Sequence, residues 1–285
     1  MLSHLNYILW NPDVEAFHLF GFSVRWYSLC WLIGLVLAYF IVQRLYKQQK
    51  IKDELFDPLF LYCFFGILLG ARLLVVYVPQ SGTYTTSSSA AITFVPEAPM
   101  PVEVAVASGT WKFVGYEGLA SHGGTIGLIV ALYLYYRRTR LNLWQVLDNI
   151  AIATPITACF IRLGNLMNSE IIGKVTDVPW AFIFERVDKM PRHPGQLYEA
   201  IAYFVFFFVG LWLYRKHPQR VGTGFFFGLC LTLIFTFRFF IEYTKDIQVD
   251  FESGMPLNMG QILSLPFIAI GIYCMRRKGK GQAAK

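Results

Sequence analysis

The sequence predicts an all-α integral membrane protein with seven transmembrane helices, an amino terminus outside the cell and a carboxyl terminus in the cytoplasm. The first observation is composition: 55% of the 285 residues are apolar and only 15% are charged, with a mean hydropathy of +0.47. Such a chain is too apolar for an ordinary soluble domain. The second observation is the length of its apolar runs, because a bilayer core needs roughly 20 mostly apolar residues per helix.

Seven continuous apolar runs supply the predicted helices, and they are too long and too uniform for the strands of a transmembrane barrel. In chain order they are Trp26 to Val42, Leu59 to Val78, Leu119 to Tyr136, Leu143 to Ile161, Leu197 to Tyr214, Val221 to Tyr243 and Met259 to Met275. Residues 1–285 are therefore expected to form a single membrane domain.

Lysine and arginine set the orientation, because cytoplasmic loops carry an excess of both. Most of the 25 basic residues fall in four segments that seven spans place on one side: "RLYKQQKIK", "RRTR", "RKHPQR" and the tail "RRKGKGQAAK", residues 276–285. That side is predicted to be cytoplasmic. The outer segments are then residues 1–25, 79–118, 162–196 and 244–258, and the first span is expected to act as the insertion signal.

Other classes of site and partner are disfavoured. The net charge of +7 is accounted for by membrane orientation, so nucleic acid is not an expected partner. The five cysteines fall inside predicted spans, and no disulfide is expected. With no CxxC, no HExxH and no ligand-like histidine spacing, neither a metal nor another cofactor is expected.

Ionisable residues inside a membrane are costly and mark functional sites by default. In this chain they gather at the outer ends of predicted spans, at Arg72, His122, Arg162, His193, Arg238 and Glu242. Simpler explanations exist. Arg238 and Glu242 could form only an ion pair along one helix, and Arg72 could extend to the interface. In "SHGGTIG", residues 121–127, the glycines could serve close helix packing and the histidine could cap its helix.

Two motifs add hydrogen-bonding groups to this outer layer. "RLGNLMNSEIIG", residues 162–173, gathers a guanidinium and two carboxamides at the level of the lipid headgroups. A guanidinium fork matches the oxygens of a phosphate. "RHPGQLYEA", residues 192–200, brings a histidine, a glutamine and a glutamate to the start of the fifth span. The first of these motifs predicts a phosphate clamp.

Five motifs in this order, "SHGGTIG", "RLGNLMNSEIIG", "RHPGQLYEA", "FRFFIEYTKD" and "NMGQILSLP", resemble those of the bacterial prolipoprotein diacylglyceryl transferase family. The similarity covers Trp26 to Pro266. It implies an enzyme of the bacterial plasma (inner) membrane whose site faces the outer, periplasmic side. The implied reaction transfers the diacylglyceryl group of phosphatidylglycerol to the lipobox cysteine thiol in a prolipoprotein signal segment. A thioether forms and glycerol phosphate leaves.

The resemblance also implies roles for individual residues. Catalysis is expected of His122, Arg162 and Arg238, with His122 as base for the thiol and the arginines on the lipid phosphate. Glu242 is expected to orient Arg238. The implied substrate-binding residues are Arg162, Asn165, Tyr27, Gly123, Gly124, Asn168, Glu170, Glu242, His193 and Gln196.

Three features depart from the family pattern. Gly195 stands where a hydroxyl side chain is usual, so that hydroxyl is not required for the chemistry here. Leu74 replaces an expected glycine, which weakens the assignment of a role to Arg72. The outer loop 79–118 is longer than the family requires, and its role is open.

Two other functions remain compatible with these residues. A transporter for an anionic solute would also place arginine at membrane depth, although no internal repeat is seen. Another lipid-modifying transferase that uses phosphatidylglycerol would need the same clamp. Only the diacylglyceryl transfer requires a protein thiol as acceptor.

Overall fold

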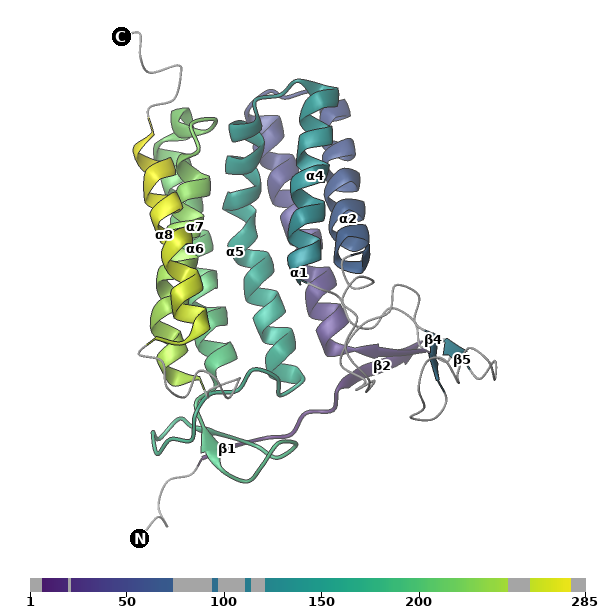
Figure 1. Ribbon diagram of the computed structural model, residues 1–285, viewed down its shortest axis with the longest axis vertical. Helices are drawn as coiled ribbons and strands as arrows, with labels where there is room; N and C mark the ends of the chain where they lie inside the picture. Colours follow the sequence, from purple (N-terminus) through teal and green to yellow (C-terminus); the bar gives the residue numbers. More distant parts are fainter. Residues whose placement is uncertain are drawn as a thin grey trace. The chain divides into compact units, whose positions relative to one another are not determined.

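The computed structural model describes residues 7–19, 22–73, 94–96, 111–113, 121–245 and 257–277. At residues 72, 73, 121 and 122 it describes the backbone and not the side chain. Helices dominate (Figure 1), with bounds α1 Trp26–Gln48, α2 Phe56–Leu73, α4 Ser121–Thr139, α5 Leu143–Met167, α6 Gly195–Lys216, α7 Phe225–Ile241 and α8 Met259–Arg276. Short 3-10 turns are η1 Asp53–Leu55, η3 Pro218–Arg220 and η4 Glu242–Thr244.

Within these described ranges, six helical segments are long and apolar enough to cross a membrane. They comprise α1, α2 with η1, α5, α6, α7 with η4, and α8. Large apolar side chains such as Phe40, Phe204 and Trp212 stay more than 45% exposed along them, which is typical of helices that face lipid. The chain is therefore an all-α membrane protein that crosses the bilayer several times.

The predicted span at 119–136 corresponds to α4, which is not among the six. Its first turn carries Ser121 and His122, and its last turn carries Arg137 and Arg138. These polar ends leave a shorter apolar stretch than in the other helices. The seventh span therefore stays a prediction.

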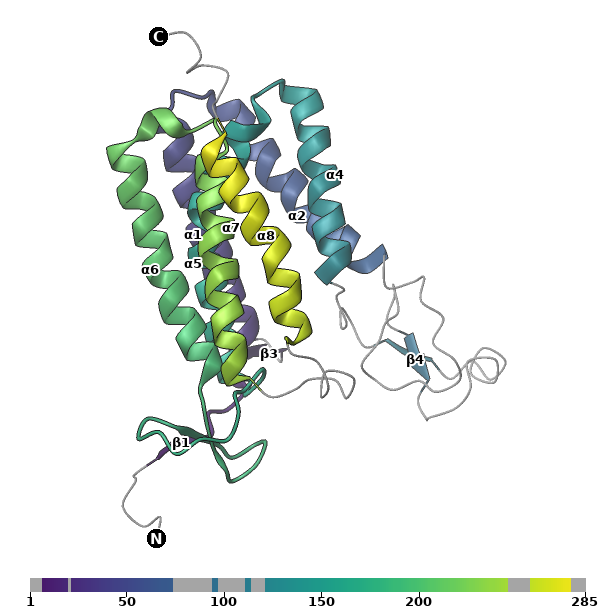
Figure 2. The same cartoon turned by 60° about the vertical axis from the view of Figure 1, so that its left-hand side comes forward.

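The chain divides into two compact units, Met1–Gln49 with Asn142–Lys285 and Lys50–Leu141. In the first unit α5 is central, because it packs against α1, α6 and α7, while α8 packs on α7 (Figures 1 and 2). Half of the α5 span is buried, against 33% or less for the other helices. Side chains on different faces of α5 therefore pack against different helices.

Asp148 anchors the start of α7 to α5. Its carboxylate is fully buried and accepts hydrogen bonds from the backbone N–H groups of Gly222, Gly224 and Phe227 at 2.8–3.0 Å. A carboxylate satisfies the otherwise unpaired N–H groups of a helix amino terminus. At the same end, the guanidinium of Arg277 stacks over the ring of Trp144 at 4.4 Å.

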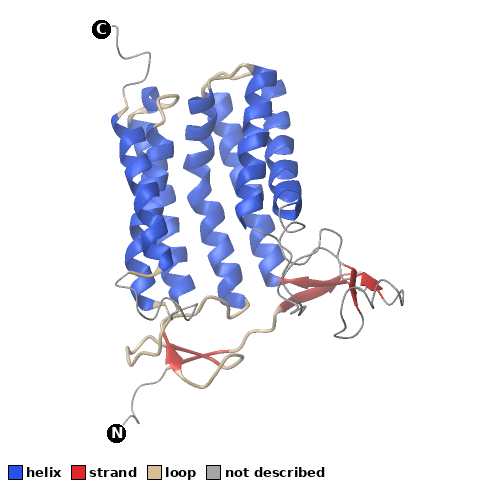
Figure 3. Cartoon of the chain, viewed as in Figure 1, coloured by secondary structure: helices blue, strands red, loops and turns tan. Residues whose placement is uncertain are grey.

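Three short strands lie at the opposite end of this unit (Figure 3). β1 (Ile8–Trp10) pairs in parallel with β6 (Phe182–Phe184), which pairs antiparallel with β7 (Pro191–Arg192). The indole of Trp10 donates to the carbonyl of Leu166 at 2.9 Å, which fixes the sheet to the end of α5. A separate antiparallel pair, β2 (Glu15–Leu19) and β3 (Phe22–Arg25), precedes α1.

The second unit is built on α2 and α4, with a small pair of strands, β4 (Phe94–Pro96) and β5 (Trp111–Phe113). The two helices approach closely through glycines. A Cβ added at Gly127 would meet the carbonyl of Gly66, and one at Gly70 would meet the carbonyl of Gly123. The alternative interpretation of the "SHGGTIG" glycines as packing residues is therefore supported.

We predict that Gly127→Ala destabilises the protein, because the added methyl group must displace the backbone of α2. Overpacking of this kind costs roughly 1–3 kcal/mol. The midpoint of thermal unfolding in detergent should fall by several degrees. Gly210→Ala in α6 is the matched control, because a Cβ there meets nothing within 4 Å. Equal midpoints for the two variants would contradict the close helix contact.

Candidate functional site

Charged side chains converge at one end of the first unit, where α5 ends, α6 begins and α7 ends (Figure 2). They are Arg162 in α5, Glu199 in α6, Arg238 in α7, Glu242 in η4 and Lys245 just after η4. Arg162, Arg238 and Glu242 were expected at this site from the sequence.

The centre of the cluster is the carboxylate of Glu199, whose side chain is 1% exposed. Its Oε2 forms an ion pair with Nε of Arg162, and its Oε1 lies 2.7 Å from Nζ of Lys245. Because an unpaired buried charge costs several kcal/mol, this carboxylate requires both cations. Glu199 therefore joins α6 to α5 and to the segment after α7.

Lys245 continues the network to a second acid. Its Nζ lies 3.4 Å from Oε2 of Glu242, and its side chain is only 6% exposed. Among the described residues, Glu242 therefore forms its ion pair with Lys245. The ion pair between Glu242 and Arg238 that the sequence suggested is not formed. The carboxylate is turned toward Lys245 and α8: a Cβ at Gly260 of α8 would lie 2.6 Å from Oε1 of Glu242, so the backbone of α8 packs directly on the carboxylate.

Arg238 is half-buried at the end of α7, and its Nε has no hydrogen-bond partner among the described residues. Tyr203 of α6 lies close enough to interact electrostatically with Arg238, Arg162 and Glu199. The electrostatic environment of this tyrosine therefore includes both arginines. Arg238 is the one that retains an unpaired buried donor.

The motif 162–173 folds back on itself. Arg162 Nη1 donates to Asn165 Oδ1 at 3.3 Å, and Asn165 Nδ2 donates to Glu170 Oε2 at 3.0 Å. Asn168 Nδ2 donates to the other oxygen of Glu170 at 3.0 Å. Ser169 adopts a positive φ of 56°, so the chain leaves the helix and returns Glu170 toward these amides. The structure thus brings together all four predicted residues of this motif.

Tyr27 reaches the motif from the first turn of α1. Gly164 permits this approach, since a Cβ there would lie 3.0 Å from Cδ2 of the tyrosine ring. The phenol interacts electrostatically with Glu170 and Arg162. Tyr27, a predicted substrate-binding residue, therefore lies against the helix segment that carries the arginine motif.

His193 and Gln196 lie beside the cluster but outside its ion pairs. Nδ1 of His193 is 3.2 Å from the hydroxyl of Tyr198, which accepts from Nε1 of Trp180 at 2.8 Å. Partial burial lowers the pKa of His193 below its usual value. Gln196 is buried and donates through Nε2 to the carbonyl of Glu170. Both residues thus contact the loops around the site rather than the arginines.

The remaining predicted residues belong to the second unit. His122 is the second residue of α4, and Arg72 precedes the last residue of α2; both side chains lie outside the described part. Gly123 and Gly124 are buried. Their packing partners are on α2, because the carbonyl of Gly123 faces Gly70 and a Cβ on Gly124 would contact Ile67.

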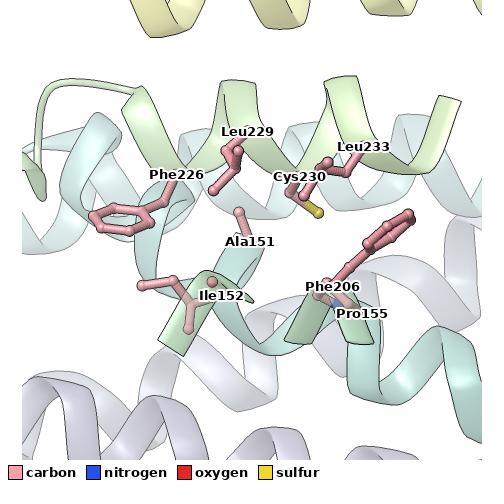
Figure 4. A pocket seen from close by; sticks show the side chains of 9 residues that line it. Ala151, Ile152, Pro155, Phe206, Phe226, Leu229, Cys230 and Leu233 are labelled. Atoms are coloured by element: carbon pink, nitrogen blue, oxygen red, sulfur yellow. The ribbon is translucent and has the colours of Figure 1, made fainter. Parts of the chain in front are cut away.

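The described parts of the chain hold no group of three His, Cys, Asp or Glu residues that could bind a metal ion. A small pocket lies between α5, α6 and α7 (Figure 4), lined by apolar residues such as Pro155, Phe206, Phe226 and Leu233. Its lining includes the thiol of Cys230 and no charged side chain.

Sequence reasoning did not assign a role to Glu199 or Lys245. The available signal for Glu199 was its position: it is an acidic residue in the second turn of a mostly apolar helix. Lys245 stands three residues after Glu242 on a chain segment that was expected to be an outer loop. Its partner on α6 is remote in sequence, so local spacing gave no reason to connect them.

Comparisons with known proteins show to which family the chain is similar. The family model described as prolipoprotein diacylglyceryl transferase matches residues 14–277. A protein named phosphatidylglycerol–prolipoprotein diacylglyceryl transferase from Bacteroides fragilis is 58% identical over 278 residues, covering 98% of both chains. Proteins of the same name are 41% identical in Tolumonas auensis, covering 97% of this chain and 99% of that one, and 38% identical in Porphyromonas gingivalis, covering 96% and 95%.

We predict that Gly173→Ala disrupts the loop packing around the site. A Cβ at position 173 would lie 2.6 Å from Cβ of His193 and 2.7 Å from the carbonyl oxygen of Thr244. The carbonyl of Thr244 is part of the backbone and cannot move aside easily. Gly173→Ala should therefore lower the free energy of unfolding by roughly 1–3 kcal/mol and lower the thermal unfolding midpoint.

The matched control is Gly195→Ala, because the nearest atom to a Cβ there is the carbonyl oxygen of Ile171 at 3.9 Å. Its midpoint should stay within about a degree of wild type, at a cost below about 0.5 kcal/mol. A large loss at position 195, or none at 173, would refute the packing seen around these two glycines.

Proposed function

The chain belongs to the prolipoprotein diacylglyceryl transferase family, and from this premise we propose how its residues perform the reaction. It is a transferase that acts at the diacylglyceryl transfer step of lipoprotein maturation. The donor is phosphatidylglycerol, and the acceptor is the lipobox cysteine thiol of a prolipoprotein signal segment. The single observation that carries the assignment of roles is the buried ion-pair network at the ends of α5, α6 and α7, in which Glu199 pairs with Arg162 and Lys245.

The reaction exchanges one bond for another. The cysteine sulfur attacks the glyceryl carbon that carries the phosphate, a carbon–sulfur bond forms and the carbon–oxygen bond breaks. The bonding electron pair leaves with glycerol phosphate, so negative charge grows on the phosphate oxygens. Guanidinium groups placed at those oxygens stabilise the transition state more than the ground state. This is the role proposed for Arg162 and Arg238.

The thiol must lose its proton before or during the attack. A free cysteine has a pKa near 8.5 and is only a few per cent thiolate at neutral pH. His122 is proposed as the acceptor of this proton, because an imidazole with a pKa of about 6.5 is suited to base catalysis. Gly123, Gly124, Tyr27, Asn165, Asn168, Glu170, Glu242, His193 and Gln196 are proposed to shape the substrate site around these groups.

The topology is part of the proposal. Counting α4 as a seventh span places the amino terminus outside and the basic tail 276–285 in the cytoplasm. The charge pattern supports this orientation, since α1, α6 and α8 all have basic residues in their last turns. The charged network lies at the other end of the same unit. It would then face the outer side of the bacterial inner membrane, where the signal segment arrives.

Transfer can be tested with purified protein, phosphatidylglycerol and a synthetic lipobox peptide. The mass of the peptide should rise by one diacylglyceryl unit, and the matched peptide with cysteine replaced by serine should not change. Binding of lipid and peptide without a mass increase would favour another transferase that uses the same lipid. Binding of neither would favour transport of an anionic solute.

We predict that Arg162→Lys lowers kcat/KM at least about 100-fold, because lysine keeps the charge but loses the planar fork that contacts two phosphate oxygens. Initial rates of peptide modification measure the effect. Arg215→Lys, at the opposite end of α6, is the control and should retain wild-type rates. A near-normal rate for Arg162→Lys would refute the phosphate clamp.

We predict that His122→Asn lowers the rate by about 100-fold or more. In wild type kcat/KM should rise with pH as the imidazole loses its proton, because the imidazole must be neutral to accept a proton from the thiol. The residual rate of the variant should lack this rise. His217→Asn, beyond the end of α6, serves as control. Substantial turnover with an unchanged pH profile would assign His122 to positioning rather than base catalysis.

A further inference from the structure

We infer that Glu199 and Lys245 are positioning residues of this site: Glu199 holds Arg162 in the orientation that binds the lipid phosphate, and Lys245 balances the charge of Glu199. The inference rests on the proposed function and adds two residues to it. It is carried by the ion pairs Arg162–Glu199 and Glu199–Lys245, which link α5, α6 and the segment after η4.

The hydrogen bonds of Arg162 show how it is held. Its Nε pairs with Glu199, and one N–H of Nη1 donates to Asn165 at 3.3 Å. A guanidinium has five N–H donors in a rigid plane, so two contacts in that plane fix the whole group. The donors that remain are on Nη1 and Nη2. These donors form the edge that matches two oxygens of a phosphate.

Glu199 is placed to act through Arg162 rather than on the substrate. Its side chain is 1% exposed, and both oxygens already face cations. Its position is fixed by the backbone of α6, whose first residues, Gly195 and Gln196, are also buried. A carboxylate in this position limits the rotamers of Arg162 without contacting the lipid.

Lys245 offsets the negative charge that Glu199 places beside Arg162. A single buried carboxylate paired only with Arg162 would cancel the charge that must attract the phosphate. Lys245 lies 2.7 Å from the same carboxylate, so Glu199 is shared between two cations. Within the ion-pair network, Arg162 and Lys245 balance Glu199 and Glu242, so the charge of Arg162 is not cancelled by Glu199 alone.

This charge balance predicts different effects for two substitutions. Lys245→Met removes one positive charge and leaves Glu199 to offset Arg162, so the KM for phosphatidylglycerol should rise about tenfold. Glu199→Gln adds positive charge but releases Arg162. Its KM should stay equal or fall, while kcat should drop 10- to 100-fold. A general loss of folded protein would not raise KM in one variant and lower kcat without raising KM in the other.

A double-mutant cycle tests whether Glu199 acts through Arg162. Once Arg162→Lys has been made, adding Glu199→Gln should lower kcat by less than about threefold, because the group that Glu199 positions is already gone. Losses that multiply would show independent roles and would overturn the inference. A wild-type kcat for Glu199→Gln would do the same. Glu185→Gln, on an exposed loop where Glu185 accepts from Asn11, is the control with unchanged kinetics.

Thermal unfolding of every variant accompanies the kinetics. If Glu199→Gln fails to fold, Glu199→Asp keeps the charge but shortens the reach to Arg162, and the same cycle applies. Wild type is assayed first with the cysteine and serine peptides. If wild type modifies neither peptide, the proposed function fails. If wild type is active and the cycle is additive, only the positioning role of Glu199 and Lys245 fails.

Discussion

The arrangement of this site depends on one buried carboxylate. Glu199 is 1% exposed and pairs with Arg162 of α5 and Lys245 after α7. Leaving such a charge without partners costs several kcal/mol, so the ends of three helices must meet around it. The backbone around the network is accordingly close-packed. Gly260 admits the carboxylate of Glu242, and Gly164 admits the ring of Tyr27.

Backbone hydrogen bonds reinforce the same convergence. The segment after α5 passes between the start of α6 and the end of η4: Gly173 N–H donates to the carbonyl of His193 at 2.9 Å, and Lys174 N–H donates to that of Thr244 at 2.7 Å. Three sequence motifs that are far apart in the chain therefore meet along one short stretch. Lys245 is positioned by this stretch through its bridge to Gly173, as well as by its ion pairs.

Periodicity and hydropathy were sufficient to find the helices but not their ends or partners. The fourth apolar run was expected to stop at Ile161, whereas α5 continues to Met167. The helix continues because Arg162 and Asn165 point into the protein, where Glu199 and Glu170 satisfy them. Local spacing paired Glu242 with Arg238, the nearest cation on its own helix. The partner in the structure is Lys245, and the backbone of α8 at Gly260 packs against the carboxylate, a contact that no local pattern reveals.

A paired network is better suited to this chemistry than a set of free arginines. Cations without counterions at membrane depth would be costly to bury and would adopt several rotamers. Pairing them with Glu199 and Glu242 lowers that cost and fixes the donors before lipid arrives, which is the condition for electrostatic stabilisation without reorganisation during the reaction. Nε of Arg238 is buried and has no hydrogen-bond partner among the described residues. A bound phosphate would supply an acceptor for it, so the arrangement of donors at the end of α7 favours an anionic lipid.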